Sequence, residues 1–301
     1  MFRELRMKFE TVYCKLLNII NVSWLGKMFR SDKNNSYPHT YSPFGIPGDK
    51  FVATDTKVKI IIDPTPKYFE RQLKYDLKHY DKTLLIHGCE TPDLNNIKKQ
   101  LIEYGSKFTK VYSFDKDVLR EVKGSELFCF GSCWVVDEKS VYKNHFDTNK
   151  KFKLSFIRSF KNNLPGHKLR YEIEKLVTKK YNFELLFPRE KIVSKVPLFI
   201  DSMFHITIEN SSHDNYFTEK IIDCFMSYTI PIYWGSPNIA EYFDQNGIIK
   251  FNSKEELENI LTNLTEEDYF SRLQSVKKNY EIAKEKYAFF FERVNELILK
   301  L

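Results

Sequence analysis

Residues 204–234 read FHITIENSSHDNYFTEKIIDCFMSYTIPIYW and contain three apolar-periodic segments joined by turns. The runs 204–208 and 230–234 are typical of buried strands, and 218–228 has the apolar period of a helix. A polar turn precedes that helix, and Thr218 is the candidate N-cap. A strand, a helix and a second strand in this order indicate a parallel sheet with helices on its faces.

The same alternation of strands and helices is expected over most of the chain. Further strands are expected at 58–62, 83–87, 108–114, 127–136, 154–157 and 248–251, and helices at 68–80, 92–104, 167–181 and 238–243. The polar segment 141–153 separates two α/β halves. Ligands of such folds bind where strand ends and helix starts meet, so we expect a ligand cleft between the halves.

The chain is expected to divide into four parts. They are an N-terminal amphipathic helix with a linker at 1–50, a first α/β domain at 51–150, a second α/β domain at 151–265, and C-terminal helices at 266–301. Turn-forming residues crowd 31–50, which is why a linker is placed there.

Composition excludes several classes of protein. The 301 residues are 42% hydrophobic and 29% charged, which is typical of a globular chain rather than a disordered or fibrous one. The net charge of +7 comes from 47 Lys and Arg against 40 Asp and Glu, a mild bias toward anionic ligands. There is no dense basic run and no nucleic-acid motif, so no nucleic-acid partner is expected. Five cysteines without a CxxC pair favour a reducing compartment.

The first 30 residues carry an apolar seam with spacings of three and four. Its members are Phe2, Leu5, Phe9, Val12, Leu16 and Ile19. Three interpretations remain open: a helix docked on the body, a helix on a membrane surface, or a short coiled-coil contact. No apolar run reaches the roughly 18 residues of a membrane span, and no secretory signal is recognised. We therefore expect a cytoplasmic protein, with residues 1–30 as the candidate for peripheral membrane contact.

The loop 209–217 feeds the start of a helix, a place that favours anions. Free backbone N–H groups and the positive end of the helix dipole point there toward a ligand. Lys220, in the first turn, runs against the usual preference for acids at this end, which is understandable if it shares an anionic ligand with the amides. The alternative is that Glu219 and Lys220 are solvated first-turn residues.

Residues 208–237 resemble the C-terminal motif of the α-1,3/1,4-fucosyltransferases, glycosyltransferase family 10. That motif runs Glu-Asn-Ser/Thr, a short spacer, Tyr-x-Thr-Glu-Lys, then Ile/Val-Pro-Ile/Val-x-x-Gly, and it matches here in order and spacing. The resemblance implies a GT-B-like fold, with two Rossmann-like domains facing across a cleft and a helical C-terminal tail. It also implies inverting transfer of fucose from GDP-fucose to a glycan hydroxyl, with the acceptor and base in the first domain and the donor in the second.

The resemblance assigns donor-binding roles to four residues of the motif. Lys220 would neutralise a phosphate oxygen, Glu219 and Tyr216 would hydrogen-bond sugar hydroxyls, and Asn210 would contact the phosphates. Upstream, the resemblance implies that Arg170 binds the donor pyrophosphate as the second cation of a clamp, a role that suits a guanidinium because it can hold two phosphate oxygens. Arg158, His167 and Lys168 compete with Arg170 for this role, and Arg170 as a surface helix residue is the structural alternative.

The first domain is expected to supply the catalytic base. His87-Gly88-Cys89-Glu90-Thr91-Pro92 resembles the family's Gly-x-Glu turn, which makes Glu90 the candidate to take the proton of the acceptor hydroxyl. His87 is an alternative base or an acceptor contact, and a helix-capping role is the alternative for Glu90.

Neither a metal nor a cofactor is expected beyond the GDP-fucose donor. Asp115-Lys116-Asp117 spells a pattern that binds divalent metals in another class of glycosyltransferase. Here it follows a strand and opens a helix, where Asp is favoured as a cap. The resembled family does not depend on a bound metal. Two other functions remain open, namely the same fold with another nucleotide-sugar donor, and a non-catalytic sugar- or nucleotide-binding relative.

Overall fold

The computed structural model describes residues 37–42, 46, 48–88, 97–136 and 146–301, and it contains two five-stranded parallel sheets. The first sheet has the order β1-β2-β3-β4-β5. Its strands are β1 (His39–Tyr41), β2 (Val58–Ile62), β3 (Lys82–His87), β4 (Lys110–Ser113) and β5 (Glu126–Leu127). Every residue of β2 is buried, as expected for a strand covered on both faces.

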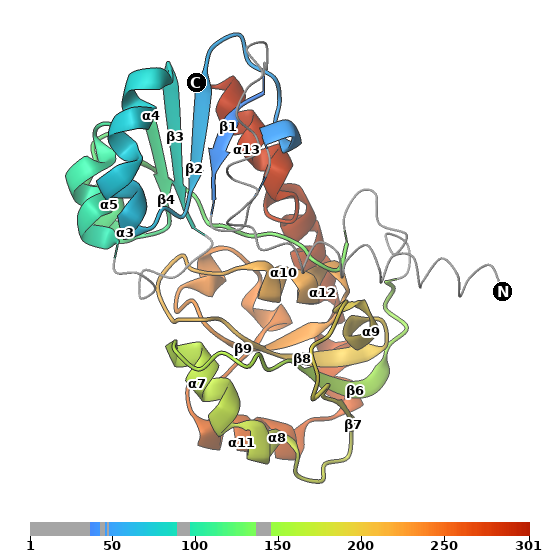
Figure 1. Ribbon diagram of the computed structural model, residues 1–301. Helices are drawn as coiled ribbons and strands as arrows, with labels where there is room; N and C mark the ends of the chain where they lie inside the picture. Colours follow the sequence, from blue (N-terminus) through green and yellow to red (C-terminus); the bar gives the residue numbers. More distant parts are fainter. Residues whose placement is uncertain (1–36, 43–45, 47, 89–96, 137–145) are drawn as a thin grey trace, which may run out of the picture.

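The second sheet has the order β10-β9-β8-β6-β7. Its strands are β6 (Lys151–Phe156), β7 (Glu184–Leu186), β8 (Ser202–Ile208), β9 (Ile230–Trp234) and β10 (Ile249–Lys250). All seven residues of β8, the central strand of this sheet, are buried. The two sheets form separate halves of the molecule (Figure 1), in agreement with the two α/β units expected from the sequence.

Helices cover both sheets. Those of the first half are α3 (Pro66–Arg71), α4 (Leu73–His79), α5 (Lys98–Gly105) and α6 (Lys116–Glu121), and those of the second are α7 (Pro165–Glu172), α8 (Glu174–Val177), α9 (Val196–Phe199), α10 (Glu219–Met226), α11 (Lys254–Asn263) and α12 (Glu266–Lys286). Among the helices of the described ranges, none has both the length and the apolar character that crossing a bilayer requires. The apolar seam within 1–30 lies outside the described residues.

The expected strand 127–136 is wrong beyond its first residue, because pairing ends at Leu127. Residues 128–136 are called the crossing segment here. Backbone groups of this segment form hydrogen bonds with side chains that are distant in the sequence. Arg293 donates to the carbonyl oxygens of Cys129 and Phe130 at 2.8 and 2.6 Å. Gly131 has φ 41°, and a Cβ there would lie 2.7 Å from the Tyr287 side chain. Apolar composition alone could not reveal this, because a buried irregular segment and a buried strand have similar residues.

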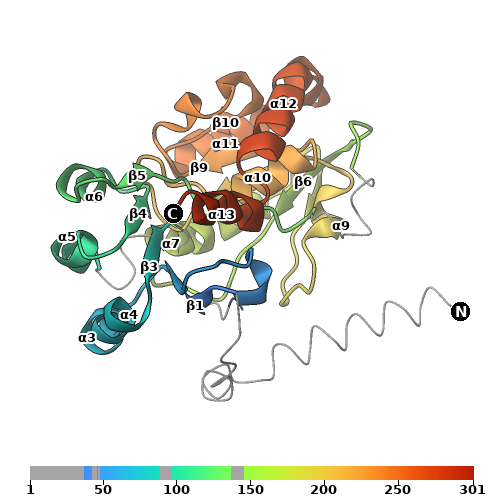
Figure 2. The same ribbon diagram turned by 90° about the horizontal axis from the view of Figure 1, so that it is seen from above.

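The last helix, α13 (Phe290–Leu299), returns to the first half of the molecule. Its buried residues Phe290, Val294 and Ile298 join the core formed by β2 and β3. Two views place this helix beside the first sheet (Figures 1 and 2). The two ends of the described chain therefore build one half, and the crossing segment lies between that half and the second sheet.

Candidate active site

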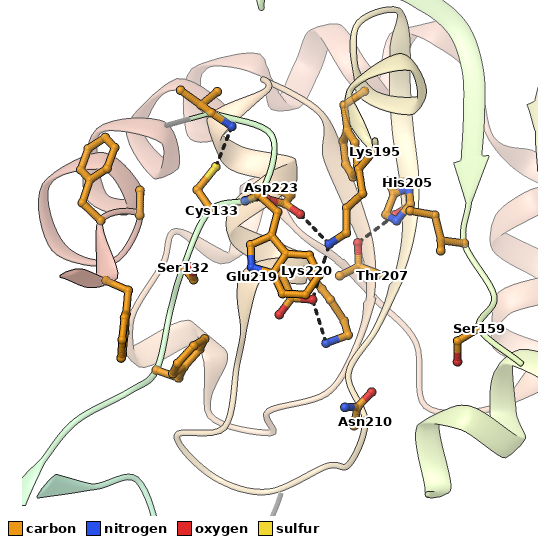
Figure 3. A pocket seen from close by; sticks show the side chains of 18 of the residues that line it. Ser132, Cys133, Ser159, Lys195, His205, Thr207, Asn210, Glu219, Lys220 and Asp223 are labelled. Atoms are coloured by element: carbon orange, nitrogen blue, oxygen red, sulfur yellow. Dashed lines mark hydrogen bonds and ion pairs between the residues drawn. The ribbon is translucent and has the colours of Figure 1, made fainter. Parts of the chain in front are cut away.

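A cavity of about 980 Å³ is lined by both halves of the molecule. The crossing segment and the start of α13 form one part of its wall, and α7, the end of β8 and the start of α10 form another. Of the five donor-binding residues predicted from the sequence, Arg170, Asn210, Glu219 and Lys220 line this cleft. Figure 3 shows Asn210, Glu219 and Lys220 within it.

A fully buried carboxylate, Glu209, organises the start of α10. Thr218 has the extended backbone of an N-cap, as expected, but its side chain makes no capping bond to the helix. Its amide and hydroxyl donate instead to Glu209 Oε1 and Oε2, at 2.9 and 2.6 Å. Charged hydrogen bonds of this kind are short and strong, so Glu209 fixes the loop between β8 and α10.

Lys220 is held by carboxylates on two sides. Its Nζ lies 3.3 Å from Glu219 Oε1 and 3.4 Å from Glu209 Oε2, and it donates to Thr218 Oγ1 at 2.8 Å. Glu219 is 7% exposed, and burial by itself would raise the pKa of its carboxyl group. The nearby charges of Lys220 and Lys195 outweigh burial and lower that pKa to about 2. Glu219 is therefore an ionised hydrogen-bond acceptor in the cleft.

Three further residues at this site were not predicted from the sequence: Lys195, Asp223 and Trp134. Lys195 Nζ lies 2.8 Å from Asp223 Oδ2 and 3.5 Å from Glu219 Oε1 (Figure 3). The same ammonium group is 4.4 Å from the centre of the Trp134 ring, a distance typical of a cation–π interaction. The backbone amide of Trp134 donates to Asp223 Oδ1 at 2.6 Å. One signal for Asp223 was available in the sequence. Asp223 follows Glu219 by four residues, so both lie on one face of a helix whose remaining residues, apart from Lys220, are apolar.

Arg170 lies in the wall of the cleft but is only 6% exposed. Its guanidinium group donates to the backbone oxygen of Ile208, at the end of β8. Burial lowers the pKa of Arg170, while the charges of Glu209 and Glu219 oppose that shift. The alternative of a surface helix residue is therefore wrong for Arg170, which supports the end of β8 from within the protein.

The three competitors of Arg170 occupy different positions. His167 is buried and lines the same cleft. Arg158 pairs with Glu174, Nε to Oε2 at 2.7 Å, and Lys168 is exposed. Of these three, only His167 is placed where a ligand in the cleft could meet it.

Tyr216 is fully buried, and its ring packs against Phe114 with the ring centres 5.1 Å apart. Next to it, Asn215 has φ 64° and donates from Nδ2 to the carbonyl oxygen of Phe114 at 3.0 Å. Lys116 Nζ lies 2.7 Å from Asp214 Oδ2 in the same loop. The motif loop is thus attached to the first half of the molecule, and Tyr216 is part of that contact rather than of the cleft wall.

Glu90, the candidate base, lies in 89–96, outside the described residues. His87, at the end of β3, is fully buried and bonds through Nδ1 to Ser113 Oγ at 2.9 Å. Burial lowers the pKa of His87 to about 4. Its ring is therefore neutral at pH 7 and enclosed.

The acidic pair in Asp115-Lys116-Asp117 begins α6, and its expected capping role is confirmed. Asp115 Oδ1 accepts from the amides of Asp117 and Val118, at 2.9 and 3.2 Å. Lys98 Nζ lies 3.0 Å from Asp115 Oδ2 and 2.8 Å from Asp117 Oδ2. Within the described ranges, no three His, Cys, Asp or Glu side chains are grouped as metal ligands.

Comparison with known proteins agrees with this architecture. A crystal structure of an α1,3-fucosyltransferase with GDP-fucose aligns with a TM-score of 0.51 and 15% identity, over 90% of this chain and 93% of the other. That likeness defines the class: the chain has the GT-B fold of glycosyltransferases, with two α/β units facing each other.

The sequence of the second half is similar to one family. Residues 187–294 match the family described as glycosyltransferase family 10 (fucosyltransferase), C-terminal part. The α-(1,3)-fucosyltransferase FucT of Helicobacter pylori is 35% identical over 77 residues. That match covers 26% of this chain and 15% of the relative's length.

Proposed function

We propose that this protein transfers fucose from GDP-fucose to a hydroxyl group of a glycan, with inversion at the anomeric carbon. The observation that carries the proposal is the joint position of Glu219, Lys220 and Asn210 at one cleft between two α/β units. These residues belong to the segment that matches the fucosyltransferase family, and one fold relative was crystallised with GDP-fucose.

The donor is proposed to bind across the start of α10. Lys220 and the first amides of the helix attract the diphosphate, and Asn210 donates to its oxygens. Glu219 accepts hydrogen bonds from the sugar hydroxyls, a role that suits its ionised carboxylate. Arg170 supports this wall by holding the end of β8, and Tyr216 anchors the loop that carries the motif.

In the proposed reaction, Glu90 removes the proton from the acceptor hydroxyl as its oxygen attacks the anomeric carbon. The bond from that carbon to the β-phosphate oxygen breaks on the opposite side, and GDP leaves with the bonding electrons. Cationic side chains stabilise the charge that gathers on the diphosphate, so no metal ion is needed in this scheme. His87, neutral and enclosed, is a poorer candidate for the base.

Calorimetric titration with GDP-fucose, GDP-mannose, UDP-glucose and UDP-galactose tests the donor. We expect GDP-fucose to bind most tightly and the Lys220→Ala variant to lose at least tenfold in affinity, the size expected for a charged hydrogen bond. Lys179→Ala is the matched control, because Lys179 pairs with Glu258 on the surface. A UDP-sugar that binds better than GDP-fucose would contradict the proposed donor.

A second measurement separates an enzyme from a binding protein. Wild-type protein should release GDP from GDP-fucose in the presence of a glycan panel, and Glu90→Gln should bind the donor normally but release GDP at least a hundredfold more slowly. Full turnover by Glu90→Gln would remove Glu90 from the mechanism. Tight donor binding without turnover by the wild type would favour the non-catalytic alternative.

A further inference from the structure

His167 has an unusual position at the wall of the cleft. It lies in the first turn of α7, where Gly166 N donates to Asn210 O at 2.9 Å. A Cβ at Gly166 would lie 1.7 Å from the carbonyl oxygen of Glu209, so only glycine lets this turn approach the end of β8 so closely. His167 is consequently 5% exposed and still lines the cleft.

His167 makes side-chain hydrogen bonds to Asn163 and Asn210, so a phosphate oxygen in the cleft would take the place of Asn210 at the ring. Nδ1 lies 3.0 Å from the side-chain oxygen of Asn163. An amide oxygen only accepts, so with this amide orientation Nδ1 carries the hydrogen and Nε2 of the neutral ring has a lone pair. A lone pair facing a phosphate oxygen is repulsive, whereas a protonated Nε2 would donate a hydrogen bond to it.

The charges around His167 favour the neutral ring when no anion is present. Burial, followed by the positive charges of Arg170, Lys161 and Lys220, lowers the pKa of His167 to about 4. A side-chain hydrogen bond to Asn210 acts weakly in the opposite direction. Negative charge is also nearby, because Glu209 and Glu219 pair with Lys220 and face Arg170.

We propose that His167 takes up one proton from solvent when the donor diphosphate binds, and that its Nε2 then donates a hydrogen bond to a phosphate oxygen. This inference rests on the proposed function, because it requires the diphosphate to lie beside Lys220 and Asn210. The bound diphosphate places negative charge among the cations that keep the ring neutral, and so reverses the field at His167. Donor affinity is then linked to pH, with tighter binding at lower pH.

His205 is the other buried histidine at the cleft, and it is the competing source of a proton effect. Its Nδ1 lies 2.8 Å from Ser155 Oγ, and the charges that act on it are those of Lys195 and Arg170. Lys220 and Asn210, the proposed phosphate ligands, act on His167 instead. The experiment must therefore distinguish the two rings.

Calorimetric titration with GDP-fucose between pH 5.5 and 8, in buffers of different ionisation enthalpy, measures the protons taken up on binding. GDP-fucose is preferred to GDP because a terminal phosphate titrates near pH 6 and would add its own proton change, whereas the sugar diester does not. We expect net uptake, and an affinity that falls as pH rises by at most about tenfold per pH unit, the limit for one proton.

Variants identify the side chain that takes up the proton. His167→Asn should abolish the uptake and weaken binding about tenfold at pH 6, and His167→Arg should bind with little dependence on pH. His205→Asn should retain the uptake. His79→Asn, at an exposed ring stacked on Tyr75 in α4, is the matched control and should behave as the wild type. Thermal unfolding of each variant establishes that it is folded at the titration temperature.

Uptake that persists in folded His167→Asn, or binding of GDP-fucose to the wild type without any uptake, would overturn the inference. Failure of the wild type to bind GDP-fucose at any pH would overturn the proposed function instead, and this inference with it. Proton uptake lost in His205→Asn but kept in His167→Asn would transfer the role to His205.

Discussion

The ammonium group of Lys220 lies 3.4 Å from the carboxylate of Glu209, so the cation proposed to bind the donor is already paired with a buried anion. Around the start of α10, negative and positive side chains are equal in number. The carboxylates are Glu209, Glu219 and Asp223, and the cations are Arg170, Lys195 and Lys220. A diphosphate therefore competes with carboxylates for Lys220, and further positive charge in the wall of the cleft, at Lys161 and on protonated His167, becomes important for binding.

Glu209→Gln tests this competition. The change keeps the shape of the side chain but removes the charge that holds Thr218 and Lys220, so we expect the free energy of unfolding to fall by about 1–3 kcal/mol. The folded variant should bind GDP more tightly, because Lys220 loses a competing anion. Urea denaturation and calorimetry measure the two effects. Glu258→Gln, at a surface pair with Lys179, should change neither by much, and weaker GDP binding by Glu209→Gln would contradict the competition.

Arg170→Met separates support of the site from contact with the ligand. Arg170 is buried, bonds to Ile208 O and faces two carboxylates, so its loss leaves buried charge unbalanced. We expect the free energy of unfolding to fall by roughly 3–5 kcal/mol, as when one partner of a buried ion pair is removed. Arg158→Met is the control, because Arg158 has a partly exposed pair with Glu174. Unchanged stability with a large loss of GDP affinity would show that Arg170 acts mainly on the ligand.

Lys195 and Asp223 should behave as a coupled pair. Lys195→Met leaves Asp223, which is fully buried, without its 2.8 Å partner, and we expect a loss of roughly 3–5 kcal/mol in the free energy of unfolding. Lys195→Met combined with Asp223→Leu should recover at least half of that loss, because no unpaired charge remains. A double-mutant cycle from urea denaturation gives the coupling. Additive effects of the two substitutions would exclude it.

The pH dependence of stability should reflect His205. Its ring is buried, and burial followed by the charges of Lys195 and Arg170 lowers its pKa to about 3, from 6.5 for an exposed histidine. Between these values the unfolded chain binds the extra proton, so stability is complete above pH 6.5 and is lost as the pH falls. Between pH 6.5 and pH 5, protonation of this ring in the unfolded chain should lower the free energy of unfolding by roughly 2 kcal/mol.

The urea midpoint at the two pH values measures this loss. His205→Asn should have a smaller difference between pH 6.5 and 5 than the wild type, whereas His79→Asn, at an exposed ring, should not. An equal acid sensitivity of His205→Asn and wild type would show that other groups, such as His87 with its pKa lowered to about 4, dominate.

Local sequence was sufficient to predict the secondary structure of residues 204–228. The apolar run that became β8, the polar loop and the helix beginning after Thr218 were all identified, because strand and helix periods and capping preferences act over a few residues. The neighbouring positions Glu219 and Lys220 were placed at a helix start for the same reason. By contrast, the largely apolar run at 128–136 predicts a strand that does not form, since composition does not distinguish a paired segment from an unpaired one.

The sequence by itself determined two α/β units, the Glu219-Lys220 pair at the start of a helix, and the capping role of Asp115, all of which depend on contacts within short stretches. Only the tertiary structure decided that α13 packs on the first sheet and that Trp134 and Asp223, 89 residues apart, meet at the cleft. The physical reason is that burial and charge pairing between distant segments depend on how the two sheets are brought together, and no local period records that arrangement.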